Sequence, residues 1–413
     1  MQSHKRCLSL SLSLALLAAF ALVAATQANS QANVIYSFSE ASTDGLTPYS
    51  SLIADSAGNL YGTTTEGGEY EVGTVFELSP QADGSWVEQI LLSFNGADGT
   101  NENLQSRLVL DSSGNLYGVA TFGGAYNYGV AFELSPLTGG AWASTVLHTF
   151  NKDGDGIYPE GALIFDARGN LYGVTGDGGA YGLGTAFVLR KNTNGSWAEE
   201  ILHSFGNGTD GQNPNGPLTM DNLGHLYGTT YNGGAHSEGT VFALARQGNG
   251  SWQERILHAF SRSSSDGENP YAGVILASGI PGRLYGTTFN GGASGSGAVF
   301  EVARQTGGGW KETLIHSFSQ AIDGAQSRAA LTEVNGTLYG TTSLGGASDT
   351  GTVFGLAPGT GGTWTESFLY SFTESPGQSK FPYGGLLLYS DGNLYGTAQG
   401  GAYGVGSVYE IKP

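Results

Sequence analysis

Tyrosine recurs at one position of a glycine-rich segment that the chain repeats seven times. Three residues after the first glycine of each Gly-Gly pair, the copies carry Tyr70, Tyr126, Tyr181, His236, Ser294, Ser348 and Tyr403. Aromatic rings offer apolar faces on which the rings of sugars stack. If the repeats close into a ring, the five aromatic positions fall on consecutive copies and form an arc.

A second set of side chains supplies carboxylates at a fixed place between successive repeats. An Asp-Gly pair recurs there, with Asp44, Asp98, Asp155, Asp210, Asp266 and Asp323. Carboxylate oxygens accept hydrogen bonds from sugar hydroxyls, so we predict that both sets line one ligand-binding face. The alternative is structural: each tyrosine packs on its neighbouring loop, and each aspartate caps its own turn.

Histidine also recurs at one position, as His148, His203, His258 and His316. We expect these residues on the outermost strand of each repeat, where equivalent positions of two repeats diverge most. No two of them could then share a metal ion at bonding distance, so we predict no metal centre and no cofactor.

A calcium-like loop, "NKDGDG", occupies residues 151–156. Asn151, Asp153 and Asp155 take alternate positions, and Gly156 takes the sixth. The twelfth position is Ala162, which offers no carboxylate. A lone calcium site at this loop stays an open alternative.

Sequence motifs of catalysis are absent. The chain has no G-x-S-x-G elbow and no H-E-x-x-H, and its one cysteine, Cys7, lies before the first repeat. The Gly-Gly segments lack the lysine and the helix start that a phosphate-binding loop needs. Pairs of carboxylates for glycoside cleavage stay an alternative, because Asp and Glu are common and their separations are unknown.

The elements that must position these residues follow from the repeat. Its Leu-Tyr-Gly triplet starts at Leu60, Leu116, Leu171, Leu226, Leu284, Leu338 and Leu394. A nearly constant spacing of 54 to 58 residues predicts a repeat architecture. The first copy predicts four strands, at residues 50–55, 59–64, 73–80 and 86–94, and no helix. Seven sets of four short antiparallel strands predict an all-β fold, the seven-bladed β-propeller.

Ring closure is predicted from the two ends of the chain. The seventh copy stops at "GSVYEIKP" and lacks a Trp-containing fourth strand, whereas "VIYSF" at residues 34–38 matches the end of such a strand. We therefore expect the N-terminal strand to complete the last blade. The alternative places residues 34–38 at the inner edge of the first blade, with no shared blade.

The first 32 residues have the three-part layout of a secretory signal peptide. A basic head, "MQSHKR", precedes an apolar run, "CLSLSLSLALLAAFALVAA", and the small residues of "TQANSQA". We predict that residues 1–28 are a signal peptide cleaved after Ala28, or alternatively after Ala32, and that residues 29–413 are one propeller domain. A membrane anchor is the other interpretation of the apolar run.

The net charge of the chain limits which classes of partner it can bind. The chain holds 35 acidic and 16 basic residues, a net charge of −19, and cleavage would remove Lys5 and Arg6. An acidic surface repels nucleic acid and anionic membranes. No apolar stretch after residue 32 is long enough to span a bilayer. We predict a secreted monomer, extracellular or periplasmic, without a nucleic-acid partner.

The repeat unit resembles a known bacterial repeat. The pattern D-G-x-x-P, L, D-x-x-G-N-L-Y-G-T-T-x-x-G-G-x-x-x-x-G-T-V-F-E-L, W, L-H-S-F is similar to the GloVer repeat of secreted and surface-anchored proteins, over nearly all of residues 34–413. The resemblance implies no defined activity. Members often carry a C-terminal anchoring domain, and the end at Pro413 inside a repeat leads us to expect a freely secreted form. A looser resemblance to kelch propellers supports the architecture alone.

We predict a binding or scaffold propeller that recognises a polysaccharide or glycoconjugate through loops on one face. Two other function classes stay open at this point. One is a carbohydrate-active enzyme, a hydrolase or lyase, and the other is a platform for protein partners.

Overall fold

The computed structural model of the 413-residue chain describes residues 31–41, 43–99, 107–152 and 154–413. The predicted signal peptide, residues 1–28, and Asp153 of the calcium-like loop lie outside the described residues. In these ranges the single helical element is a short 3-10 helix, η1 (Thr360–Gly362), and every other regular element is a β-strand. A search of the same ranges for a helix that is long and apolar enough to cross a membrane finds none.

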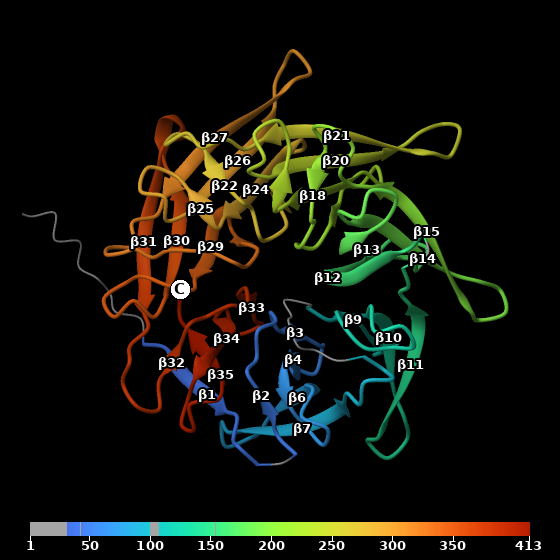
Figure 1. The fold of residues 1–413 in the computed structure, drawn as a ribbon. Helices are drawn as coiled ribbons and strands as arrows, with labels where there is room; N and C mark the ends of the chain where they lie inside the picture. The colour runs from blue at the N-terminus through green and yellow to red at the C-terminus, as the bar shows by residue number, and fades with distance from the viewer. Residues whose placement is uncertain (1–30, 42, 100–106, 153) are drawn as a thin grey trace, which may run out of the picture.

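Seven antiparallel sheets of four strands stand around a central axis, as Figure 1 shows. Blade 1 consists of β3 (Ile53–Ala54), β4 (Leu60–Thr64), β6 (Thr74–Pro80) and β7 (Trp86–Ser93), and blade 2 of β8 (Val109–Leu110), β9 (Leu116–Ala120), β10 (Val130–Pro136) and β11 (Trp142–Thr149). Blade 3 consists of β12 (Gly156–Phe165), β13 (Leu171–Gly178), β14 (Thr185–Lys191) and β15 (Trp197–Ser204), and blade 4 of β17 (Thr219–Met220), β18 (Leu226–Thr230), β20 (Thr240–Arg246) and β21 (Trp252–Ala259). Blade 5 consists of β23 (Ile275–Leu276), β24 (Arg283–Thr288), β26 (Ala298–Arg304) and β27 (Trp310–Ser317), and blade 6 of β28 (Thr332–Val334), β29 (Thr337–Thr342), β30 (Thr352–Pro358) and β31 (Trp364–Ser371). Blade 7 consists of β33 (Leu387–Leu388), β34 (Leu394–Gly400), β35 (Ser407–Ile411) and β1 (Asn33–Ser37). The prediction of a seven-bladed all-β propeller is confirmed.

Short strand pairs extend four of the blades toward one end of the ring. They are β2 (Gly45–Leu46) with β5 (Glu66–Gly67), β16 (Gly211–Gln212) with β19 (Asn232–Gly233), β22 (Gly267–Glu268) with β25 (Asn290–Gly291), and β32 (Ser379–Lys380) with β34. Each pair joins the connection that enters a blade to the glycine-rich loop inside that blade.

Phenylalanines form the contact between neighbouring blades. In each pair the Phe that ends an outer strand meets the aromatic residue of the third strand in the next blade, edge to face, with ring centroids 4.9–5.4 Å apart: Phe38–Phe76, Phe94–Phe132, Phe150–Phe187, Phe205–Phe242, Phe260–Phe300, Phe318–Phe354 and Phe372–Tyr409. The glycine of the Leu-Tyr-Gly triplet makes room for this ring. A Cβ on Gly62 would lie 2.6 Å from Cζ of Phe76.

The tyrosine of the same triplet binds the blade to its neighbour a second time. Tyr61 packs against Trp142 of blade 2 with ring centroids 6.3 Å apart, and its hydroxyl donates to Asp55 at 3.0 Å. The same Tyr–Trp contact links Tyr117 with Trp197, Tyr172 with Trp252, Tyr227 with Trp310, Tyr285 with Trp364, and Tyr395 with Trp86. One sequence pattern therefore builds the same interface repeatedly.

The ring is closed by the N-terminal strand, as predicted. β1 pairs antiparallel with β35, and in Figure 1 the blue N-terminal strand lies beside the red C-terminal one. The pairing of Tyr36 with Val408 carries the same register shift that the outer strands of the other blades show. The alternative, with residues 34–38 at the inner edge of blade 1, is excluded because β3 takes that edge.

Candidate functional site

The predicted site residues lie in two kinds of loop that share one face of the ring, which we call the loop face. One kind joins the second and third strands of a blade and contains the Gly-Gly pair. The other joins one blade to the next and contains the Asp-Gly pair. Backbone hydrogen bonds connect them: Gly179 N–H donates to Asp155 C=O and Gly234 N–H to Asp210 C=O, both at 2.8 Å.

The four tyrosines of the predicted arc stand at the tips of tight turns. In the first copy Glu71 N–H donates to Gly68 C=O and closes a turn whose third residue is Tyr70. Glu71 has a φ of 61°, and the residue at the position equivalent to Glu71 has positive φ in every copy. Tyr70, Tyr126, Tyr181 and Tyr403 are 50–62% exposed. His236 is exposed in the equivalent turn of blade 4.

One of these tyrosines borders a depression on the loop face. Tyr181 lines it together with Ile201, His203 and Asn207, and its volume is about 380 Å³. The phenol ring is therefore beside a concave surface, where a ring-shaped ligand could rest on it.

The aspartates of the Asp-Gly pairs are placed differently. Asp44, Asp155, Asp210, Asp266 and Asp323 are only 5–8% exposed. Asp155 accepts hydrogen bonds from the backbone N–H of Gly156 at 2.8 Å and of Asn151 at 3.2 Å. Asp98 is half-buried and accepts from Asn95 N–H at 2.9 Å. These carboxylates cap their own loops, as the structural alternative expects, and point into the protein.

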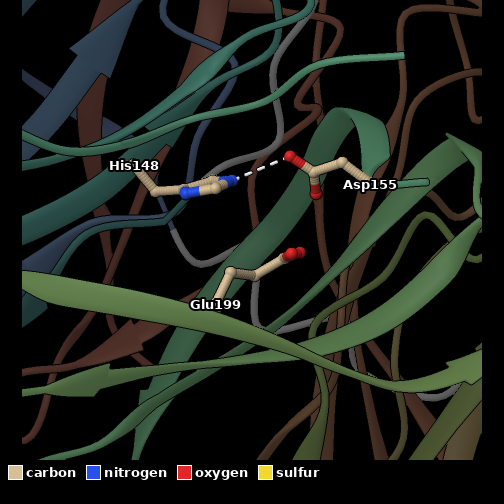
Figure 2. A group of neighbouring side chains, drawn as sticks. All are labelled: His148, Asp155 and Glu199. Carbon is tan, nitrogen blue, oxygen red and sulfur yellow. Dashed lines mark hydrogen bonds and ion pairs between the residues drawn. The ribbon is translucent and has the colours of Figure 1, made fainter. Parts of the chain in front are cut away.

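Four of the aspartates belong to a repeated cluster between adjacent blades. In Figure 2, His148 on β11 reaches Asp155 on the connection to blade 3, and Glu199 on β15 of blade 3 faces both. His148 Nε2–H donates to Asp155 Oδ2 at 2.9 Å. The other clusters are His203–Asp210–Glu254, His258–Asp266–Glu312 and His316–Asp323–Glu366, with His–Asp distances of 2.8, 3.0 and 3.0 Å. Each cluster ties two blades together.

In two of the clusters, those of Asp155 with Glu199 and of Asp210 with Glu254, the pKa of the aspartate is lowered and that of the glutamate is raised. Burial, followed by the neighbouring Asp155, raises the pKa of Glu199 to about 9. Burial opposes ionisation of Asp155 as well, but hydrogen bonds from His148 and Glu199 lower its pKa below the ordinary value. Near neutral pH the cluster of Asp155 and Glu199 thus holds one carboxylate and one carboxylic acid.

At other interfaces the histidine is replaced by another residue. Where blade 1 meets blade 2, Leu92 takes the histidine position and Ser144 takes the glutamate position. Where blade 7 meets blade 1, Tyr36 replaces the histidine and its hydroxyl donates to Glu88 at 3.0 Å. Both carboxyl groups, Asp44 and Glu88, are present at that interface, so a phenol hydroxyl can take the place of the histidine beside them.

The residue types of a cluster are those that ligate zinc, and their polar atoms lie within 4.8 Å of one another. The prediction that no two histidines share a metal agrees with their placement in four separate clusters. Each histidine nevertheless meets two carboxyl groups, which sequence reasoning missed. The signal was present as a glutamate two residues after the Trp of the next repeat, but only the blade interface shows that it faces the histidine.

The calcium-like loop offers fewer oxygen ligands than its sequence suggests. The Asn151 side-chain amide donates to Asp155 Oδ2 at 3.2 Å, and the same Asp155 oxygen accepts from His148. Two of the three alternate positions are thus engaged with each other, and the third, Asp153, lies outside the described residues.

A model of the Gloeobacter/Verrucomicrobia repeat matches the chain three times, over residues 21–141, 83–280 and 249–413. A comparison with curated proteins finds no match.

Solved structures share the fold at low sequence identity. An extracellular domain from B. thetaiotaomicron that is assigned to a one-component system is 12% identical, with a TM-score of 0.54, over 92% of this chain and 42% of that one. A second structure, the extracellular domain of a hybrid two-component system from the same organism, gives 12% identity and a TM-score of 0.53 over 92% and 39%. The chain therefore spans less than half the length of these structures, and the likeness concerns the propeller alone.

Proposed function

The chain belongs to the Gloeobacter/Verrucomicrobia repeat family, and on that premise we propose that it is a secreted binding propeller that holds a polysaccharide or glycoconjugate on its loop face. Ligand contact is assigned to the tyrosine arc, which we define as Tyr403, Tyr70, Tyr126 and Tyr181 on blades 7, 1, 2 and 3. His236 extends the arc to blade 4. The leader-like start of the sequence supports secretion.

The observation that carries the proposal is the exposure of these tyrosines. These rings occupy the same turn in successive blades and leave their apolar faces open to a ligand that can stack on them. None of the four rings stacks on another aromatic ring within the described residues. Folding does not need an aromatic residue in this turn, because Ser294 and Ser348 take the same position in blades 5 and 6.

Spacing favours a long ligand over a small one. The four tyrosines lie on separate blades, so a single monosaccharide contacts one ring, whereas a chain of sugars can run along the arc and contact several. Several weak stacking contacts on one chain add through their high effective concentration. In this proposal the buried aspartates position the turns by capping the adjacent loops.

Replacement of Tyr126 and Tyr181 by Ser tests the proposal. We expect the double variant to fold normally and to lose about 1 kcal/mol of binding free energy for each stacking contact removed. Screening residues 29–413 on a glycan array identifies a ligand, and calorimetry then compares the variant with the parent protein. Mass analysis of the glycan after incubation detects cleavage, which would indicate a hydrolase or lyase in place of a binding protein.

Ser294 and Ser348 supply the matched control, since they occupy the same turn outside the arc. Replacing them with Ala is expected to leave both binding and melting temperature unchanged. Equal losses of affinity at the serine and tyrosine positions would contradict a localised aromatic site. A lower melting temperature with unchanged affinity in the tyrosine variant would show that the rings serve packing.

A further inference from the structure

Each inter-blade connection carries one residue three positions before the buried Leu or Val that begins the next blade. In the described part these residues are Tyr49, Glu160, Asn215, Tyr271, Arg328 and Tyr383. Tyr49 and Tyr383, from blades 1 and 7, meet edge to face with centroids 4.5 Å apart. Both line an axial cavity of about 180 Å³ to which every blade contributes.

Arg328 of blade 6 is held beside this cavity, at what we call the axial mouth, by aromatic rings of both neighbouring blades. Its guanidinium lies 4.8 Å from the ring centroid of Phe289, 5.2 Å from that of Tyr383 and 5.7 Å from that of Tyr271. Stacking of this kind fixes the guanidinium plane and leaves its N–H edge free for a planar anion. The side chain is therefore preorganised before any ligand arrives.

Among the described residues, no carboxylate pairs with this cation. Arg190 pairs with Glu200 at 2.9 Å and Arg283 with Glu301 at 3.4 Å, but Arg328 makes no ion pair or hydrogen bond with any described residue. Its Nε is buried without a partner. In a chain with 35 acidic residues, a half-buried arginine without a carboxylate is unexpected unless something else supplies the anion.

The nearest acids do not supply it. Tyr271 interacts electrostatically with both Arg328 and Glu160. Burial, followed by the charge of Asp177, raises the pKa of Glu160 to about 8, so this carboxyl is mostly neutral at pH 7. Asp177 itself accepts a hydrogen bond from the Asn213 amide at 3.0 Å. An anion that approaches Arg328 therefore meets hydroxyls and aromatic rings more than negative charge.

We propose that the axial mouth binds the carboxylate of an acidic sugar, with Arg328 as the anion-binding residue and the rings of Tyr271 and Tyr383 beside the sugar. A guanidinium edge matches the two oxygens of a carboxylate, and tyrosine supplies both a ring face and a hydroxyl. The inference rests on the proposed function in taking a sugar as ligand, but the site is separate from the tyrosine arc.

Two ligands that differ in one group test the proposal: methyl glucuronide, which has a carboxylate, and methyl glucoside, which has a hydroxymethyl group in its place. We expect saturable binding of the glucuronide to residues 29–413 in a ligand-observed NMR titration, and at least tenfold weaker binding of the glucoside. Equal affinity for the two ligands, or no binding of the glucuronide, overturns the proposal. Acetate that binds as well as the glucuronide overturns the assignment of a sugar.

Variants locate the site. Arg328→Gln is expected to weaken glucuronide binding roughly tenfold or more. Arg328→Lys keeps the charge but loses the planar fork of donors, so its affinity is expected to lie between that of the parent protein and that of Arg328→Gln. Arg255→Gln is the charge-matched control, because Arg255 lies on the outer strand β21 and donates to Gly308 C=O. If Arg328→Gln does not fold, the Lys variant carries the test. Unchanged affinity in a folded Arg328 variant excludes the site.

The two proposals fail separately. The Tyr126 and Tyr181 double variant should keep glucuronide binding, because neither residue lies at the axis. Loss of polysaccharide binding in that variant with glucuronide binding intact supports both proposals. If the protein binds the glucuronide but the arc retains no polysaccharide, only the proposed function is contradicted. If the arc retains a polysaccharide but the protein does not bind the glucuronide, only the axial site is contradicted.

Discussion

The same residue types serve opposite purposes in different parts of the propeller. Tyrosine is exposed at the tip of a turn in Tyr126 but buried between blades in Tyr117, where its hydroxyl donates to Asp111 at 3.2 Å. Aspartate, which sequence reasoning places with the ligand, is instead the acceptor for loop N–H groups and for a histidine. Exposure and hydrogen-bond partners, more than residue type, decide which side chains are available to a ligand.

Replacement of Glu199 by Gln should reduce the pH dependence of stability. The folded protein holds the pKa of Glu199 at about 9 against an ordinary value of 4.5, so the stabilising proton is fully bound below about pH 4.5. Its contribution to the free energy of unfolding is lost as pH rises toward 9, at no more than about 1.4 kcal/mol per pH unit. Urea unfolding at pH 5, 7 and 9 should show a shallower decline for the variant, because the amide stays neutral.

Glu200→Gln is the control for this experiment, since Glu200 is the next residue on the same strand and pairs with Arg190 near the surface. Its pH profile should run parallel to that of the parent protein. Parallel profiles for Glu199→Gln and the parent would show that Glu199 does not carry a proton in the folded state.

Zinc should not bind strongly to the four interface clusters, although their residue types are zinc ligands. The Asp155 oxygen nearest His148 already accepts two N–H donors from Asn151, and a zinc ion would have to displace the histidine donor. Melting temperatures are expected to be the same with chelator and with added zinc. Saturation at four equivalents of zinc, with a higher melting temperature, would contradict the proton-linked interpretation.

At the scale of the strand, the glycine of the Leu-Tyr-Gly triplet sets how closely blades approach. A Cβ on Gly228 would lie 2.6 Å from Cζ of Phe242, a ring that already packs against Phe205 with centroids 4.9 Å apart. The Phe cannot move without opening this contact. A single added methyl group at this position would therefore disturb the packing at the interface between blades 3 and 4.

Gly228→Ala is accordingly expected to destabilise the protein by about 1–3 kcal/mol, the usual cost of overpacking a filled core. Gly248→Ala is the matched control, because a Cβ there meets nothing within 4 Å. Thermal melting of the two variants should give a clear loss for the first and little change for the second. Similar losses for both would mean that backbone flexibility, and not the Phe ring, is the cause.

How much the sequence predicts depends on whether a residue acts within its own repeat. The four strands and the exposed turns follow from patterns inside a single copy, and the structure has them. The partnership of His148 with Glu199 crosses two repeats, so no spacing within one copy indicates it. Arg328 escapes prediction for another reason: its position carries Tyr in three of the described repeats, Glu or Asn in two others and Arg in only one, so a search for shared residues passes over it.

At the scale of the whole molecule, the ring is a closed chain of identical contacts with one seam. Phe38 meets Phe76 with centroids 5.1 Å apart, as the equivalent rings do elsewhere, and Phe38 N–H donates to Gly406 C=O at 3.0 Å. Residues from opposite ends of the chain also join near the axis, where Thr397 Oγ1 donates to Ser50 C=O at 2.8 Å. Closure at the seam leaves no blade with an uncovered apolar face.

A chain that begins at Ser39 lacks β1 and tests this closure. Its absence should uncover β35 as an unpaired edge and remove Phe38 from the interface with blade 1, so we expect a clearly lower melting temperature and a tendency to aggregate. A synthetic peptide of residues 31–38, added in excess, should restore part of the lost stability by pairing with β35, whereas the same peptide with Phe38 replaced by Ala should restore less. A melting curve for the shortened chain that matches the parent protein would show that the seam does not hold the ring together. Rescue by the first peptide and not the second would locate the closing energy in the Phe38 side chain as well as in the strand pairing.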